Sequence, residues 1–78
     1  MLMGQGRKRL EIINRRKLIR LTQQEVANKA GISRSFYAMF ESGKRGCSLH
    51  TWFKLGGALN LSENQILEIL LKDETKNE

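Results

Sequence analysis

The sequence contains no proline, one cysteine and one histidine, and only 6% of its 78 residues are aromatic. The lone Cys47 excludes an internal disulfide and a cysteine-rich zinc site, and a single thiol fits a reducing compartment. His50 has no second metal-type ligand near it in the sequence, which indicates a surface or capping residue. We therefore expect no metal site and no cofactor.

Long apolar runs are also missing. No segment approaches the ~20 apolar residues of a membrane span, and residues 1–6 hold no apolar run of secretory length. Hydrophobic residues nevertheless make up 40% of the chain, which excludes a disordered protein of low hydrophobicity. A chain this short buries only ~60% of its unfolded surface, so we expect residues 1–78 to form one domain with a modest core. Together these features predict a small cytoplasmic protein.

Acidic residues are scarce outside the C-terminal end. Fourteen Lys and Arg against eight Asp and Glu give a net charge of +6. Residues 7–20 hold seven basic residues and one acid (+6), residues 21–60 hold five and two (+3), and residues 61–78 hold two and five (−3). A basic body with an acidic end is expected of a protein with one pole facing a polyanion. A merely solvated surface is the alternative.

Helical signals follow one another along the chain, and no segment alternates cleanly in the strand period, so we predict an all-α bundle. Apolar spacing, caps and glycines predict helices at residues 7–19, 23–30, 34–42, 49–59 and 63–72. The expected N-caps are Thr22, Ser33, Ser48 and Ser62. Gly31 and Gly43 are expected to end the second and third helices. The ordered core is expected over about residues 7–72, between a frayed basic N-terminus and an acidic C-terminal tail.

The second and third predicted helices are separated only by the turn at residues 30–32. This is the arrangement of a helix-turn-helix, in which the first helix crosses the DNA backbone and the second enters the major groove. The small Ala27 allows the two helices to meet, and Gly31 permits the tight turn. The expected core residues around them are Val26, Ile32, Tyr37 and Phe40.

Three segments resemble the Cro and phage-repressor family, often called XRE-like: residues 21–27 (LTQQEVA), 31–35 (GISRS) and 41–45 (ESGKR). The resemblance covers about residues 12–66. It implies a compact five-helix DNA-binding domain of the phage-repressor type that regulates transcription and is not an enzyme. It also implies a structural ion pair between Arg16 and Glu41. Tyr37 stands where the family usually has an aliphatic residue, so its hydroxyl needs a partner or water.

Base recognition is expected from the N-terminal part of the third helix, because side chains there reach base edges. The candidates are Ser33, Arg34, Ser35, Ala38 and Met39. Arg34 is the foremost candidate, since a guanidinium can bond O6 and N7 of guanine together. Met39 can lie against a thymine methyl, although the family more often has a polar or basic residue there.

Phosphate binding is expected from Gln23, Arg15, Arg16, Phe36, Lys44 and Arg45. Gln23 opens a helix whose free N–H groups favour a phosphate oxygen, and the family uses this glutamine similarly. Lys44 and Arg45 resemble the family's basic loop, with a solvated turn as the alternative. Phe36 either lies beside the sugar–phosphate backbone or packs at the helix edge.

The last predicted helix carries more apolar residues than one face of a small bundle needs. Ile66 and Leu70 are sufficient to close the core, which leaves some of the other apolar side chains outward. We expect a homodimer, because two-fold DNA sites suit a two-fold protein. The candidate interface residues are Trp52, Phe53, Leu67, Ile69 and Leu71. The alternative is a tilted last helix that buries both of its apolar stripes.

The function predicted from these observations is a sequence-specific regulator of double-stranded DNA, a repressor that occupies a two-fold operator as a homodimer. No catalytic Cys/His pair and no phosphate-cradling glycine loop is present in the sequence. An antitoxin or adaptor that binds protein with the same fold is the alternative. A membrane-surface binder is disfavoured, because the basic first helix lacks a wide apolar face. The sequence does not distinguish between three kinds of regulator: a phage or mobile-element repressor, a restriction–modification controller, and an antitoxin. No small-molecule ligand is evident.

Overall fold

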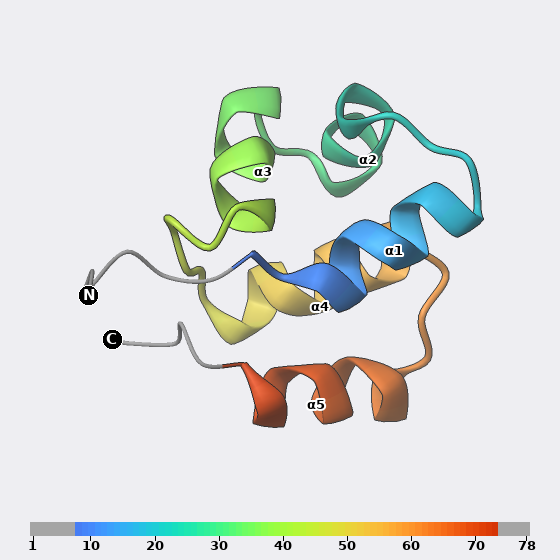
Figure 1. Cartoon of the computed structure of the whole chain (residues 1–78), viewed down its shortest axis with the longest axis vertical. Helices are drawn as coiled ribbons and strands as arrows, with labels where there is room; N and C mark the ends of the chain where they lie inside the picture. The colour runs from blue at the N-terminus through green and yellow to red at the C-terminus, as the bar shows by residue number, and fades with distance from the viewer. Residues whose placement is uncertain (1–7, 74–78) are drawn as a thin grey trace.

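A computed structural model describes residues 8–73, which form five α-helices and no strand. The helices are α1 (Leu10–Leu18), α2 (Gln23–Ala30), α3 (Arg34–Glu41), α4 (Leu49–Ala58) and α5 (Glu63–Lys72). In Figure 1, α2 and α3 lie at the top, α1 and α4 cross the middle, and α5 lies at the bottom. The all-α class is therefore confirmed. The ends that are expected to be frayed lie outside the described residues.

The four predicted N-caps are present. In each, a side-chain hydroxyl accepts the backbone N–H three residues further on, at Thr22, Ser33, Ser48 and Ser62. Capping boxes close the starts of α2 and α5, with Glu25 and Gln65 as the returning side chains. All four of these helices begin at the predicted residues. The ends of α2 and α5 are also as predicted, whereas α3 and α4 end one residue earlier than predicted.

The first helix begins at Leu10, later than the predicted residue 7. Arg9 occupies the N-cap position with φ −84° and ψ 79°, and its side chain makes no cap hydrogen bond. Its N–H instead donates to the carbonyl of Glu41 at 2.8 Å. The segment before α1 is thus hydrogen-bonded to the end of α3 and is not part of the helix.

The core lies between all five helices and is formed by ten buried hydrophobic side chains: Ile12, Val26, Ala27, Ala30, Tyr37, Phe40, Trp52, Leu55, Leu59 and Ile66. Ile32, expected in the core, is only partly buried and packs at its edge. Trp52 corrects a second expectation. It is 4% exposed and meets the Phe40 ring edge-on at 4.9 Å between centroids. The indole fills the protomer's own core and is not available to a dimer interface.

In two turns of the described chain, between α1 and α2 and between α4 and α5, the left-handed residue that ends the helix is not a glycine. Arg20 and Asn60 each take the left-handed conformation with φ 62°. In both turns the next residue returns a hydrogen bond to the helix, from Leu21 to the Arg16 carbonyl (3.1 Å) and from Leu61 to the Gly56 carbonyl (2.9 Å). This is the Schellman arrangement, which satisfies the last carbonyls of a helix.

The contact between α4 and α5 depends on a glycine. A Cβ built on Gly56 would lie 2.3 Å from both Cγ1 and Cδ1 of Ile66, so only a residue without a side chain fits there. At the neighbouring Gly57 an added Cβ would meet nothing within 4 Å. None of the described helices is long and apolar enough to cross a membrane.

Candidate nucleic-acid interface

The turn between α2 and α3 sets the direction of α3. Gly31 takes φ 73°, and the Ile32 N–H donates to the Ala27 carbonyl at 3.0 Å. Ala27 is fully buried, as expected for a small residue that lets the two helices meet, and Ala30 is buried too. Ser33 then starts α3 by accepting the Phe36 N–H at 3.0 Å. The two helices thus form a rigid helix-turn-helix.

The exposed face of α3 carries the residues expected to read bases. Arg34 and Ser35 are exposed in the first turn, and Arg34 is the only cation of this helix. Met39 is 39% exposed one turn later, whereas Ala38 is half-buried. The Ser33 oxygen is used as a cap, so its hydroxyl proton is what remains to be donated.

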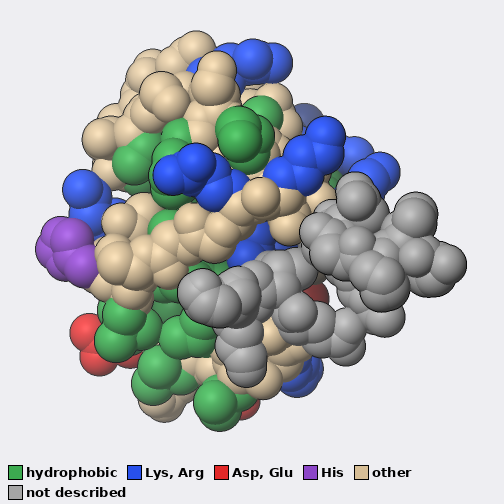
Figure 2. Space-filling view, turned by 90° about the vertical axis from the view of Figure 1, so that its left-hand side faces the viewer, with side chains coloured by type: hydrophobic (Ala, Val, Ile, Leu, Met, Phe, Trp, Pro, Cys, Tyr) green, Lys and Arg blue, Asp and Glu red, His purple; other side chains and the backbone are tan. Residues whose placement is uncertain are grey.

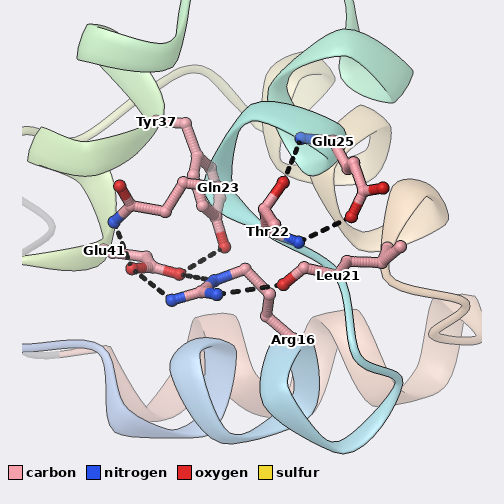
Figure 3. A network of polar contacts seen from close by, with 7 residues as sticks. All are labelled: Arg16, Leu21, Thr22, Gln23, Glu25, Tyr37 and Glu41. Atoms are coloured by element: carbon pink, nitrogen blue, oxygen red, sulfur yellow. Dashed lines mark hydrogen bonds and ion pairs between the residues drawn. The ribbon is translucent and has the colours of Figure 1, made fainter.

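Behind this face, a polar network joins α1, α2 and α3 (Figure 3). The expected ion pair between Arg16 and Glu41 is present, with Nε donating to Oε2 at 2.5 Å and Nη2 to Oε1 at 3.3 Å. The Tyr37 hydroxyl donates to Oε2 at 2.8 Å, so it finds the partner it needs. The Gln23 amide donates to Oε1 at 2.8 Å.

The contacts in this network shift the pKa values of Glu41, Arg16 and Tyr37. Burial opposes ionisation of Glu41, but the hydrogen bonds from Arg16, Gln23 and Tyr37 outweigh it and lower the pKa of the carboxyl. The hydrogen bond to Glu41 in turn raises the pKa of Arg16. Burial, followed by the contact with Glu41, raises the pKa of the Tyr37 hydroxyl. At neutral pH the group is a charged pair with a neutral tyrosine, which is suited to hold three helices together.

Two arginines expected at phosphates, Arg16 and Arg15, make hydrogen bonds within the protein. The Arg16 guanidinium is neutralised by Glu41, its Nη1 also donates to the Leu21 carbonyl, and its side chain is 14% exposed. Arg15 donates from Nε to the Leu59 carbonyl (2.9 Å) and from Nη2 to the Asn60 carbonyl (2.8 Å). It therefore ties α1 to the turn between α4 and α5. Local charge counts could not show this, because the acceptors lie more than forty residues away.

Gln23 stands at the first position of α2, where the N–H groups have no acceptor within the helix. Its half-buried side chain is oriented by the bond to Glu41. The side-chain amide of Gln23 is thereby oriented by the same network that joins α1, α2 and α3.

The basic loop after α3 folds back onto that helix. Lys44 and Arg45 are exposed, and the Lys44 N–H donates to the Met39 carbonyl at 3.0 Å. The guanidinium carbon of Arg45 lies 4.8 Å from the centroid of the Phe36 ring. Phe36 is half-buried, and the face of its ring supports Arg45.

A groove of about 410 Å³ runs between α1 and α3, next to Gln23 and Ala38. The groove is also lined by Lys8 and Lys17, which were not predicted from the sequence as phosphate-binding residues. The only signal for them was the excess of basic residues from residue 7 to residue 20. Their position beside the recognition helix adds positive charge to this side of the molecule.

Arg9 is a further residue that the sequence analysis missed. Its side chain is 4% exposed and pairs with Asp73, which lies 64 residues away in the chain. Among seven basic residues in this segment nothing distinguishes Arg9 by type or spacing.

Apolar side chains reach the surface away from the helix-turn-helix. Figure 2 shows Lys and Arg side chains across the upper half of one face, with some hydrophobic ones between them, and further hydrophobic side chains at its lower left, at the level of α5. Leu67 is 41% exposed and Leu71 82% exposed on α5, and Leu49 is 54% exposed on α4. Ile69 and Phe53 are half-buried and pack against the core, so they contribute less to this surface than expected.

Comparisons with known proteins agree with this geometry. The helix-turn-helix family model HTH_3 matches residues 12–66. The restriction–modification controller protein C.AhdI from Aeromonas hydrophila is similar in structure, with a TM-score of 0.70 and 28% identity over 74% of this chain and 88% of that chain. A point mutant of the controller protein C.Esp1396I has a TM-score of 0.73 and 21% identity over 99% of this chain and 98% of that chain, which shows a shared fold. No curated protein sequence matches the chain.

The family match covers more than half of the residues and includes the complete α2–turn–α3 unit. The fold, the outward face of α3 and this match support the same conclusion. The chain belongs to the XRE-type helix-turn-helix family and is a DNA-binding transcription regulator.

Proposed function

We propose that the protein is a homodimeric repressor that binds a two-fold operator and blocks the promoter it covers. The observation that carries this proposal is the outward face of α3, where Arg34 and Ser35 stand exposed in the first turn of a rigidly held helix. One such helix reads one half-site, so a two-fold pair of protomers matches a two-fold operator. The protein acts by binding alone, as a regulator and not an enzyme, on DNA in the prokaryotic cytoplasm.

In this proposal Arg34 reads a guanine through a bidentate contact, which discriminates against other bases by roughly 1–3 kcal/mol. Ser33 and Ser35 add weaker hydrogen bonds, and Ala38 and Met39 contact thymine methyl groups. The exposure of Arg34, Ser35 and Met39 supports these roles, whereas Ala38 is half-buried.

The DNA backbone is bound on both sides of α3. Gln23 offers the N-terminus of α2 to one phosphate, with Lys8 and Lys17 beside it along the groove. Lys44 and Arg45 bind the backbone from the loop after α3, and Phe36 supports Arg45 there. This arrangement predicts phosphate contacts that fix the register of α3 on the duplex.

Self-association is assigned to the outward face of α5. Leu67 and Leu71 are exposed there, and large apolar side chains grouped on one face favour burial against a partner. A second copy of the chain is the natural partner, because it brings a second recognition helix for the other half-site.

Control of a restriction–modification system is the host process that the comparisons favour. Both solved structures compared above are restriction–modification controller proteins, and one of them shares 28% identity with this chain. No described contact favours the antitoxin or adaptor alternative over DNA binding.

The test is selection of bound duplexes from a random DNA pool. We expect a two-fold motif, and we expect Arg34→Ala to flatten the preference at one base pair of each half-site while binding to random DNA persists. Lys72→Ala removes an exposed positive charge from α5 and serves as the control, with the motif unchanged. If Arg34→Ala weakens selected and random DNA by the same factor, Arg34 is a phosphate contact. A pool without any enriched motif would contradict sequence-specific repression.

A second measurement addresses the basic loop. Each neutralised phosphate contributes about 0.9 to the slope of log affinity against log salt concentration. We expect Lys44→Ala to make the slope shallower by about one unit and to lower affinity for all sequences alike. An unchanged slope would place Lys44 away from the DNA.

A further inference from the structure

Arg9 lies where three parts of the described chain meet: the segment before α1, the loop after α3, and the end of α5. Its Nη1 donates to two backbone carbonyls of the α3 end and the following loop, to Phe40 at 2.5 Å and to Arg45 at 2.8 Å. Its backbone N–H donates to the Glu41 carbonyl at 2.8 Å. Arg9 therefore binds the end of α3 and the basic loop together.

The other edge of the same guanidinium holds the end of α5. Nε and Nη2 donate to the two carboxylate oxygens of Asp73, at 3.1 and 3.2 Å, and the two side chains are only 4% and 6% exposed. The guanidinium also lies over the Phe40 ring, 4.2 Å from its centroid. Such a fork, with its fixed plane and several donors, cannot be reproduced by a lysine.

Arg45 is consequently held at two points. Its carbonyl accepts a hydrogen bond from Arg9, and its own guanidinium rests on the Phe36 ring of α3. With its backbone held by Arg9 and its guanidinium resting on a ring, Arg45 needs less ordering when it meets a ligand, and affinity gains from such preorganisation.

We infer that Arg9 is a positioning residue for DNA binding: by joining the Arg45 carbonyl to the Asp73 carboxylate, it fixes the basic loop relative to α3. This inference rests on the proposed function, in which Arg45 contacts a phosphate. It adds that the loop's position depends on the end of α5, the helix that also carries the outward Leu67 and Leu71.

The experiment compares the contribution of Arg45 in four backgrounds. Asp73→Asn keeps the size of the side chain and removes the charge that holds the guanidinium. Arg9→Lys keeps the charge and removes the fork. Glu11→Gln is the matched control: it also removes a carboxylate charge that links α1 to α5, in the exposed pair Glu11–Lys72 at 3.6 Å, but it does not touch the loop. The wild type is the fourth background.

In each background the salt dependence of affinity for the selected operator is measured with Arg45 and with Arg45→Ala. In the wild type and in Glu11→Gln, we expect Arg45→Ala to make the log–log slope shallower by about 0.9. In Asp73→Asn and Arg9→Lys, we expect that change to shrink to less than half. Helical content by circular dichroism checks that each variant is folded, and Asp73→Asn carries the comparison if Arg9→Lys does not fold.

An equal slope change in all folded backgrounds would overturn the inference and leave Arg9 a purely structural role. A wild type without salt-dependent binding to DNA would be a different result, since it would refute the proposed function together with this inference. Loss of the Arg45 effect in Glu11→Gln as well would show that any change at the α1–α5 contact disturbs the loop, and would also contradict a specific role for Arg9.

Discussion

The two adjacent glycines of α4 allow the α4–α5 contact to be tested with an internal control. Both lie inside the helix, so replacing either by alanine reduces the freedom of the unfolded chain and favours the helix, by about 1 kcal/mol. They differ in their surroundings. An alanine Cβ at Gly57 would meet nothing within 4 Å, whereas at Gly56 it would lie 2.3 Å from two atoms of Ile66.

The expected changes have opposite signs. Gly57→Ala should raise the free energy of unfolding by about 1 kcal/mol. At Gly56 the same gain is opposed by overpacking, which typically costs 1–3 kcal/mol. We expect the cost here to be about 3 kcal/mol, at the upper end of this range. Ile66 is 3% exposed, and two of its atoms would have to move. Gly56→Ala should therefore lower the free energy of unfolding by about 2 kcal/mol. The resulting difference of about 3 kcal/mol corresponds to roughly 12–24 °C in Tm for a domain of this size.

Urea unfolding followed by far-ultraviolet circular dichroism measures these changes. Ile66→Val removes the Cδ1 atom that an alanine at position 56 would meet, so it should restore part of the stability lost in Gly56→Ala. In the wild type the same substitution should cost about 1 kcal/mol. If Gly56→Ala stabilises the protein as much as Gly57→Ala does, α5 does not approach the α4 backbone as described, and the reasoning is refuted.

Four other substitutions test the network, one turn and the apolar surface. Tyr37→Phe should lower the free energy of unfolding by about 1–2 kcal/mol, because Glu41 loses one donor and keeps the others; an unchanged urea midpoint would contradict this. Folding lowers the pKa of Glu41, so its carboxylate stabilises the fold above the unfolded pKa, and this stability is lost as pH falls through the folded pKa. Glu41→Gln should therefore be less stable at neutral pH, yet lose less stability on acidification than the wild type; equal losses would disprove the shift. Arg20→Gly should raise stability by about 1 kcal/mol, since glycine adopts φ 62° without strain; thermal unfolding decides. Leu71→Glu should shift the protein toward monomer in sedimentation with helical content unchanged, whereas Leu18→Glu, at another exposed leucine, should not; a dimeric Leu71→Glu would move the interface elsewhere.

The helices could be predicted from the sequence because their ends are decided by neighbouring residues. Ser62, for example, caps α5 through Gln65, three residues away, and Gly31 ends α2 by its own conformation. The helix-turn-helix followed from the same local signals. Its exposed residues, such as Arg34, followed from the direction in which helical side chains point.

The contacts that the sequence did not predict join residues far apart in the chain. Arg15 is a basic residue on a basic helix, and only the folded chain shows that its guanidinium group meets the Leu59 and Asn60 carbonyls. The pairing of Arg16 with Glu41, in contrast, was already implied by the family resemblance. Trp52 is a large apolar side chain that suits an interface as well as a core. In the folded chain it lies in the core, where its ring contacts Phe40. Arg9 was indistinguishable from its basic neighbours until the fold brought Asp73 to it.

The pair of Arg9 and Asp73 has a consequence for the order in which the molecule assembles. It closes a loop of 64 residues, nearly the whole described chain, and closing so long a loop has a large entropic cost before other contacts form. Helices and their short turns form first, since their contacts are local. The two ends are then joined after α3 already has its place in the bundle. We therefore expect the hydrogen bond from Arg9 to the Arg45 carbonyl to form after the local contact of Lys44 with Met39, and to be lost before it when the two ends separate.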